Sequence, residues 1–202
     1  MNLEKIIKEA LPALQKTGTW IQNEAQSFDL NKVVLKGKND LVSYVDKEAE
    51  KKLVIDLKSI LPEAGFITEE DTADDDQKEF TWIIDPLDGT TNFIHGLPVY
   101  SISVGLLQGK DIVGGIVYEL NKKELFYAWK GGGAFLNDNP IRVAPTQDLS
   151  NSLLATGFPY YQFDKLDNYL AIIKDLMMHS HGLRRLGSAA VDLAYVACGR
   201  YE

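Results

Sequence analysis

The sequence predicts an α+β fold in which helices stack in layers on sheets whose strands run mostly antiparallel. Three observations favour this fold. Apolar residues recur at helical spacing near the N-terminus, short apolar runs separated by turn residues fill the middle of the chain, and strand-like and helical segments alternate after residue 150. The 202 residues are enough for one good core or for two small domains that share an interface.

Two helices are predicted in the first third of the chain. Residues 2–26 carry apolar side chains on one face, and Pro12 is expected to kink this helix or to shift its local hydrogen bonds. Residues 32–41 are expected to form an extended piece and a mobile loop. The second helix has Asp46 in its first turn and ends at about Leu61, because a proline follows.

The remaining elements are predicted from apolar runs and the turn residues between them. A short strand over residues 65–68 ends in three acids, and the apolar run that ends at Asp85 is typical of a buried strand. Three further runs separated by turn residues favour an antiparallel meander. The predicted later elements are strands at residues 101–107, 112–118, 124–129, 141–143, 153–157 and 183–186, and helices at residues 165–178 and 189–198.

Composition excludes several classes of protein. The net charge of −8 argues against a broad surface for nucleic acid or for anionic membranes. The one cysteine, Cys198, leaves no internal disulfide and fits a reducing compartment. No apolar run approaches the roughly 20 residues that span a bilayer, and the first residues lack the apolar core of a signal peptide. We therefore expect a cytoplasmic protein without a nucleic-acid or membrane partner.

Residues 82–93 carry the chemistry on which the functional prediction depends. Pro86 favours extended geometry for Asp85, the residue before it. Asp88 follows, with Gly89 and Thr90 behind it, in an order that suits a tight turn into the N-terminus of a helix, where backbone N–H groups favour an anion. The stretch therefore predicts two carboxylates beside an anion site.

Two carboxylates this close repel each other unless a cation lies between them. Ligands that are all oxygen indicate a hard metal such as Mg²⁺, which binds one or two carboxylates together with water and substrate phosphate. The competing interpretation is an ordinary Asp-Gly turn with a capping aspartate, and it fits a bare Asp-x-x-Asp-Gly better. The twelve residues together favour the metal and phosphate site.

At residues 85–93 the chain resembles the inositol monophosphatase family, whose first signature reads Asp-Pro-(Leu/Ile)-Asp-Gly-Thr-Thr-Asn-Phe. The resemblance extends to residues 36–46, 66–70 and 187–190. It implies a layered αβαβα sandwich, commonly a homodimer, that hydrolyses a small phosphate monoester with two or three Mg²⁺ ions. Inositol monophosphate is the substrate it favours first.

The resemblance also implies roles for particular residues. Glu69 binds the first metal and, together with the Thr90 hydroxyl, holds the attacking water. Asp85 bridges two metals, Leu87 lends its carbonyl oxygen, and Asp88 serves the second metal. Asp46 reaches a third, weaker metal site, although a helix-capping role with Ser43 also explains it. The residues expected to bind substrate are Asp88, Gly89, Thr90, Gly187, Ser188 and Ala189.

A second family signature, Trp-Asp-x-Ala-x-Gly, is expected a little beyond Glu202, where this sequence stops. Its aspartate serves the second metal in the family. We therefore expect that the C-terminal part of the fold is missing from this chain. Residues 1–145 are predicted to form an N-terminal α+β half that carries the site, and residues 146–202 to start an incomplete C-terminal α/β half.

Several alternatives remain open from the sequence. The enzyme can be a broad-specificity or nucleotide phosphatase that acts on NADP, 3′-phosphoadenosine 5′-phosphate or fructose bisphosphate, or the chain can be a catalytically silent metal-binding scaffold. Lithium sensitivity is also open. His179 and His181 have the spacing of a zinc pair but no third ligand in view. Lys36 and Lys38 are candidates to hold phosphate or metal-bound water, with a solvated lysine pair as the competing interpretation, and Arg184 or Arg185 is a candidate phosphate contact. Glu70 has no assigned role.

Overall fold

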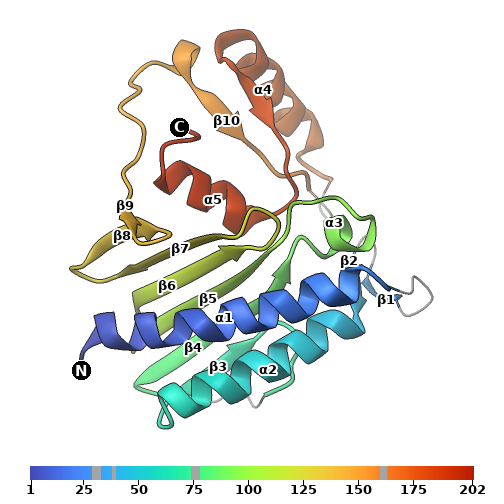
Figure 1. Ribbon diagram of the computed structural model, residues 1–202. Coiled ribbons are helices and arrows are strands. Elements are labelled where there is room, and N and C mark those ends of the chain that lie inside the picture. Colours follow the sequence, from blue (N-terminus) through green and yellow to red (C-terminus); the bar gives the residue numbers. More distant parts are fainter. Residues whose placement is uncertain (29–32, 38–39, 74–77, 160–162) are drawn as a thin grey trace.

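A computed structural model describes residues 1–28, 33–37, 40–73, 78–159 and 163–202. Within this part of the chain, seven strands form one sheet in the order β3-β4-β5-β6-β7-β8-β9. Helices α1 and α2 cover one face of this sheet and α5 lies on the other, while α4 and a small sheet lie beyond α5 (Figure 1). The helices are α1 (Leu3–Ala25), α2 (Tyr44–Ile60), α3 (Thr90–Ile94), α4 (Leu166–His179) and α5 (Ala189–Ala197).

The strands of the large sheet run antiparallel except at one edge, where β3 and β4 are parallel. This largely antiparallel sheet with helices on it confirms the predicted fold class. The strands are β3 (Gly65–Thr68), β4 (Phe80–Asp88), β5 (Ser101–Gln108), β6 (Asp111–Glu119), β7 (Glu124–Trp129), β8 (Gly133–Leu136) and β9 (Asn139–Pro140).

Two small sheets flank the large one. An antiparallel pair, β1 (Val33–Gly37) and β2 (Asp40–Ser43), leads directly into α2. A parallel pair, β10 (Leu153–Ala155) and β11 (Gly182–Arg184), is connected through α4. A 3₁₀ turn over Leu149–Asn151 precedes β10. The expected strand at 153–157 is thus shorter, and the one expected at 183–186 is shifted toward the N-terminus. The pairing ends with a backbone hydrogen bond from the N–H of Thr156 to the carbonyl oxygen of Arg184.

The core lies between the sheet and helices α1 and α2. Alternate residues of each strand point to opposite faces, so Ile102, Val104 and Leu106 join the core under these helices. Phe126, on the opposite face of β7, joins a second cluster with α5. Helix α1 runs unbroken through Pro12. Among the described residues, no helix is both long and apolar enough to cross a membrane.

Helix α1 approaches β6 closely because glycine leaves room for it. A Cβ on Gly114 would lie 2.5 Å from Cδ1 of Ile7, and a Cβ on Gly18 of the helix would lie 2.7 Å from Cε1 of Tyr118. Neither distance is sterically possible without a shift of the neighbouring atoms. The two glycines therefore set the spacing between the helix layer and the sheet.

The strand predicted at residues 141–143 is wrong. The chain reverses at Asn137 and Asp138, whose φ values of 46° and 66° form the turn of the β8–β9 hairpin. Strand β9 then ends at Pro140, which has no N–H to continue the ladder. A last backbone bond, from Ile141 N–H to the Ala134 carbonyl at 2.9 Å, follows the strand.

Candidate active site

Strand β4 brings two acidic side chains to one end of the sheet. Asp85 pairs with Ser103 of β5 and Asp88 pairs with Ser101, with a break in register between the two pairs. The expectation that this strand ends at Asp85 was wrong, because the strand continues to Asp88. The pairing is interrupted at Pro86, since its nitrogen has no hydrogen to donate, and it resumes at Asp88. Both acidic residues therefore flank an interruption in the ladder.

Glu69 follows β3 and reaches Asp85. The N–H of Glu69 donates to the carbonyl oxygen of Ile84 at 3.2 Å, which extends the pairing of β3 with β4. The side chains of Glu69 and Asp85 are hydrogen-bonded to each other. Burial raises the pKa of Asp85 to about 9, and the charges of Glu69 and Asp88 add to the rise. The negative charge of these carboxyl groups favours the binding of a positive charge, which can be a shared proton or a cation.

Thr90 connects this cluster to helix α2. Its Oγ1 lies 3.0 Å from Oδ1 of Asp46 and 3.0 Å from the carbonyl oxygen of Leu87, so that one hydroxyl serves two acceptors. The N–H of Leu87 in turn donates to Oδ1 of Asp85 at 3.1 Å. The backbone of Leu87 thus contacts both groups, the carboxyl group of Asp85 through its N–H and the hydroxyl of Thr90 through its carbonyl oxygen.

Asp46 is buried and uses both of its oxygens. Oδ2 accepts hydrogen bonds from the N–H and the hydroxyl of Ser43, at 2.8 and 2.6 Å, and Oδ1 faces Thr90. Burial raises the pKa of Asp46, and the hydrogen bonds from Ser43 and Thr90 oppose that rise. The capping box expected from the sequence is confirmed. Asp46 therefore caps α2 and orients the Thr90 hydroxyl at the same time.

Gly89 joins β4 to α3 in a left-handed conformation, with φ at 99°. A Cβ at this position would lie 3.0 Å from the carbonyl oxygen of Val99 and 3.2 Å from that of Gly187. Glycine is therefore required both by the backbone conformation and by the close approach of two other segments. Helix α3 is short, with five residues.

The N-terminus of α5 holds Asp88. The hydroxyl of Ser188 and the N–H of Ala190 both donate to Oδ2 of Asp88, each at 2.6 Å. The oxygen of Ser188 also lies 3.2 Å from the hydroxyl of Ser101. These contacts join residues about a hundred positions apart. They bring the predicted segment of residues 187–189 beside Asp88.

Gly187 and Asn92 fix the approach of α5 to this site. Nδ2 of Asn92 donates to the carbonyl oxygens of Val99 and Leu186, at 2.7 and 2.8 Å. A Cβ on Gly187, whose φ is 92°, would lie 2.9 Å from that same Nδ2. The role of Asn92 was missed from the sequence, although it belongs to the nine-residue signature.

Glu50 was also missed from the sequence. It lies on α2 one turn after Asp46, with its side chain fully buried. Its oxygens accept from the N–H of Glu70 at 2.8 Å and from the N–H of Thr72 at 3.0 Å. The available signal was an acid next to the apolar stripe that includes Leu53, where a solvated charge is out of place.

Among the other candidate residues described, Arg185 comes near the site, because a Cβ on Gly187 would lie 2.7 Å from its Nη1. Nδ1 of His179 contacts Asp175 of its own helix, and the backbone N–H of His181 donates to Ser152. Nη1 of Arg184 donates to a neighbouring carbonyl, while the guanidinium of Arg185 lies over the Phe158 ring. Two further candidates are not described: Lys38 lies outside the described residues, and so does the side chain of Lys36.

Comparison with known proteins identifies the family of this chain. A profile described as the inositol monophosphatase family matches residues 2–202. The chain belongs to the inositol monophosphatase family. It is therefore a phosphoric monoester hydrolase by family, and members of this family are generally metal-dependent.

Similar proteins carry two kinds of name. An inositol-1-monophosphatase of Mesorhizobium japonicum is 37% identical over 203 residues, which cover 100% of this chain and 76% of that protein. A protein named Nus factor SuhB from Vibrio cholerae is 39% identical over 202 residues, which cover 99% of this chain and 75% of that protein.

Solved structures agree with the described fold. The extragenic suppressor protein suhB of Bartonella henselae superposes with a TM-score of 0.91 at 36% identity, covering 98% of this chain and 76% of that one. An IMPase of Thermotoga maritima superposes with a TM-score of 0.85 at 32% identity, covering 95% and 72%. The layered arrangement of helices and sheet is therefore that of the inositol monophosphatases.

The donors near Asp85 suit a hard divalent cation. In the part of the chain described, no three side chains of His, Cys, Asp or Glu surround a common point as a ready-made metal cage. Magnesium does not require such a cage, because it usually binds one or two carboxylates and keeps several waters. Glu69 and Asp85, already in contact, and the carbonyl of Leu87 offer only oxygen. The donor set therefore fits the metal dependence of the inositol monophosphatase family.

Proposed function

We propose that this protein hydrolyses a small phosphate monoester in a Mg²⁺-dependent reaction, with inositol monophosphate as the first candidate substrate. One observation carries the proposal. The neighbouring carboxyl groups of Asp85, Glu69 and Asp88 lie beside the Thr90 hydroxyl and the N-terminus of α5. Such a cluster repels a phosphorylated alcohol until divalent cations reverse its charge.

The metal ligands in this proposal are Glu69, Asp85, the carbonyl of Leu87, and Asp88. When bound, Mg²⁺ neutralises charge on the phosphate oxygens and lowers the pKa of water. Asp46 is proposed as a ligand of a third, weaker site, with its capping bonds as the competing role. Two or three ions are expected in all.

The protein side chains would position the reactants. The carboxylate of Glu69 accepts a hydrogen bond from the attacking water and then its proton, and the hydroxyl of Thr90, oriented by Asp46, holds the same water in line with phosphorus. As the water oxygen bonds to phosphorus, the bond from phosphorus to the alcohol oxygen breaks on the opposite side, and the leaving alkoxide takes a proton from solvent. Asp88, steadied by Ser188, accepts hydrogen bonds from the hydroxyl groups of the substrate. The backbone of Gly89 and of residues 187–189 completes the substrate contacts.

Phosphate release by the intact protein tests this proposal. Inositol 1-phosphate, fructose bisphosphate, NADP and 3′-phosphoadenosine 5′-phosphate are supplied with and without Mg²⁺. We expect hydrolysis to require Mg²⁺ and to favour inositol 1-phosphate. Asp85→Asn should lower kcat/KM by about 10²–10³-fold. The matched control is Asp111→Asn, which removes an exposed carboxylate 3.0 Å from Lys130 and should leave activity unchanged. An Asp85→Asn variant with the parent's turnover and Mg²⁺ affinity refutes the proposal.

If another of the four compounds is hydrolysed fastest, the proposed reaction stands and only the proposed substrate changes. The relatives named Nus factor SuhB motivate a second candidate, a catalytically silent metal-binding scaffold. An intact protein that binds Mg²⁺ in calorimetry but releases phosphate from none of the four compounds favours this second function.

The family also motivates proposals about organisation. We propose a cytoplasmic homodimer, which sedimentation and cell fractionation test, and lithium inhibition, which the same phosphate assay tests. Within the chain, residues 1–145 form the half that carries the metal ligands, and residues 146–202 belong to a second, α/β half. The separate sheet of β10 and β11 supports this division.

A further inference from the structure

Glu50 holds a short segment of chain around its carboxylate. The side chain is fully buried. Oε2 accepts from the N–H of Glu70 at 2.8 Å, while Oε1 accepts from the N–H of Thr72 at 3.0 Å and from its hydroxyl at 2.7 Å. All three donors belong to residues 70–72, which follow β3 and Glu69 in the chain.

This segment includes the residue that reaches Asp85. The N–H of Glu69 is held by the Ile84 carbonyl on β4 at 3.2 Å, and the next N–H along the chain, that of Glu70, is held by Glu50. Asp71 then turns into a left-handed conformation, with φ at 53°, which returns Thr72 to the same carboxylate. The backbone on both sides of the Glu69 side chain is thereby fixed.

A buried carboxylate is unfavourable unless donors compensate for the loss of water. Here the compensating donors come from the segment beside the carboxyl cluster, so the stability of Glu50 and the conformation of that segment depend on each other. Glu50 also belongs to the same helix as Asp46, which orients Thr90. One rigid helix, α2, is therefore linked to two sides of the candidate site.

We propose that Glu50 is a positioning residue for the metal site: by binding the N–H groups of Glu70 and Thr72 it sets the backbone of Glu69, whose carboxyl group is then directed at Asp85. The inference rests on the proposed metal role of Glu69. Glu50 itself touches neither the substrate nor the metal.

Glu50→Gln is the main test, because it keeps the size of the side chain but replaces one acceptor oxygen by an NH₂ group that faces an N–H donor. In the metal-free intact protein, amide hydrogen exchange over residues 69–72 should become at least about tenfold faster, while exchange in α1 stays unchanged. Calorimetry should show Mg²⁺ affinity reduced by about 10–100-fold. At saturating Mg²⁺, KM for the substrate should stay within about twofold.

The chain offers matched controls. Glu48→Gln changes an exposed glutamate of the same helix, which pairs with Lys51, and should change neither exchange nor Mg²⁺ affinity. Thr72→Val removes one donor and keeps Glu50, so it should weaken Mg²⁺ binding in the same direction but less. Thr72→Ser, which keeps the hydroxyl, should restore the parent values. The threonine pair decides the question if Glu50→Gln does not fold.

Two outcomes overturn the inference, and they are distinguishable. Parent-like exchange and Mg²⁺ affinity in Glu50→Gln, while Glu69→Gln loses affinity, show that Glu50 positions nothing and leave the proposed function intact. Parent-like Mg²⁺ affinity in Glu69→Gln removes the metal role of Glu69 itself, and the proposed function fails with it.

Discussion

Gly89 shows how one residue can depend on both backbone conformation and space. Its φ of 99° is disfavoured for any residue with a side chain, and a Cβ would press on two carbonyl oxygens. Gly96 also has a positive φ, 69°, but a Cβ there would meet nothing within 4 Å. The two glycines therefore separate the conformational cost from the steric one.

We expect Gly89→Ala to lower the free energy of unfolding by about 2–4 kcal/mol and to reduce kcat as well. Gly96→Ala should cost only about 1 kcal/mol, with kcat unchanged, because it carries the backbone penalty alone. Urea unfolding and phosphate release measure both effects. Equal losses in the two variants contradict the steric argument at Gly89.

Asp85 predicts a pH dependence for the metal-free protein. Its folded pKa of about 9 lies well above the unfolded value of about 3.9. The folded state therefore binds the proton more tightly, and this contribution is complete below the unfolded pKa and is lost as pH rises through about 9. We expect the parent in EDTA to lose stability between pH 5 and 9 more steeply than Asp85→Asn does.

Urea unfolding at several pH values measures that slope, with Asp111→Asn as the control that keeps it. If the unfolding free energy changes equally with pH in the parent and in Asp85→Asn, the argument that burial raises the pKa of Asp85 is refuted. Excess Mg²⁺ should abolish the slope in the parent, since the cation replaces the proton as the source of positive charge.

At the level of single residues, the sequence named candidate site residues where a signature covers each position, as for Asp85, Asp88 and Thr90, and their roles stay predictions. The place of Glu50 beside an apolar stripe was a signal, but its role could not be predicted because its donors, Glu70 and Thr72, are twenty or more positions away. A glutamate on a helix is usually solvated, and only the tertiary fold buries this one.

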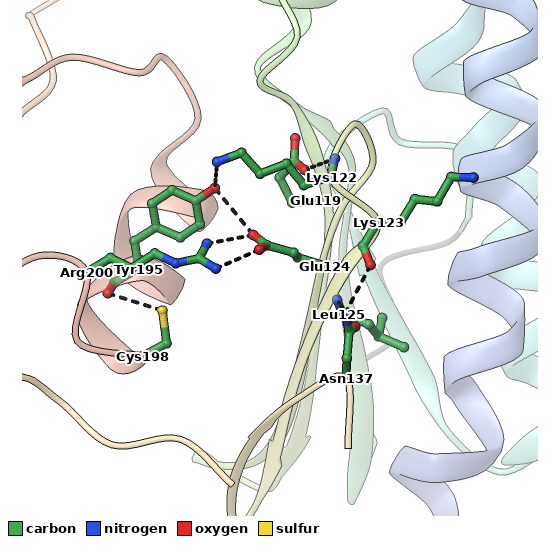
Figure 2. A network of polar contacts seen from close by, with 9 residues as sticks. All are labelled: Glu119, Lys122, Lys123, Glu124, Leu125, Asn137, Tyr195, Cys198 and Arg200. Carbon is green, nitrogen blue, oxygen red and sulfur yellow. Dashed lines mark hydrogen bonds and ion pairs between the residues drawn. The ribbon is translucent and has the colours of Figure 1, made fainter. Parts of the chain in front are cut away.

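Helix α5 is held at both ends. Its N-terminus binds Asp88, and beyond its C-terminus Arg200 donates two hydrogen bonds of 2.6 Å to Glu124 (Figure 2). The Tyr195 ring packs between the guanidinium of Arg200, 4.5 Å from the ring centre, and Nζ of Lys122, at 4.8 Å. This network fixes the helix to the turn between β6 and β7.

Breaking the pair of Glu124 and Arg200 should therefore loosen the whole helix. We expect Glu124→Gln to lower the free energy of unfolding by about 1 kcal/mol at pH 7, because the pair is only partly exposed and bidentate. Hydrogen bonds from Arg200 lower the pKa of Glu124. The contribution is present above the unfolded pKa and disappears as pH falls through the folded one, so the variants should converge in acid.

Urea unfolding at pH 7 and at pH 3 measures this convergence. Asp56→Asn is the matched control, since it removes a surface pair with Lys16 and should change stability by less than about 0.5 kcal/mol. An effect of Glu124→Gln no larger than that of the control means that the network does not hold α5.

The sequence predicted elements best where apolar spacing was long and regular, as in α1 and α2. It failed at residues 141–143, where Ile141 and Val143 alternate like a strand but Pro140 has already ended the ladder. It also extended the last strands too far, because their ends depend on pairing between β10 and β11 rather than on local composition.

For the whole molecule, the decisive distance is that between the helix layer and the sheet. Gly114 and Gly115 are adjacent on β6 but differ in their surroundings: a Cβ on Gly114 meets Ile7 at 2.5 Å, and one on Gly115 meets nothing closer than 3.8 Å. Their comparison isolates the packing of α1 from the strand propensity that both positions share.

We expect Gly114→Ala to lower the free energy of unfolding by about 1–3 kcal/mol through overpacking, and Gly115→Ala to change it by less than about 0.5 kcal/mol. Adding Ile7→Val should recover part of the loss, because it removes the atom that clashes. A double-mutant cycle by thermal or urea unfolding measures this coupling, and additive effects contradict direct contact between Ile7 and Gly114.

The order of strands in the sheet could not be predicted from periodicity. The parallel pairing of β3 with β4, which places Glu69 beside Ile84, joins segments whose local patterns contain no information about each other. The family resemblance supplied the overall layers, and only the fold brought Ser188 to Asp88.

That last contact has a consequence for synthesis of the protein. Asp88 leaves the ribosome 102 residues before Ala190, whose N–H completes the cradle of its carboxylate. At about 5–20 residues per second, the acidic end of β4 stays open on the nascent chain for roughly 5–20 s. The first half can collapse during that time, but the contacts of the Asp88 carboxylate are completed only when α5 emerges.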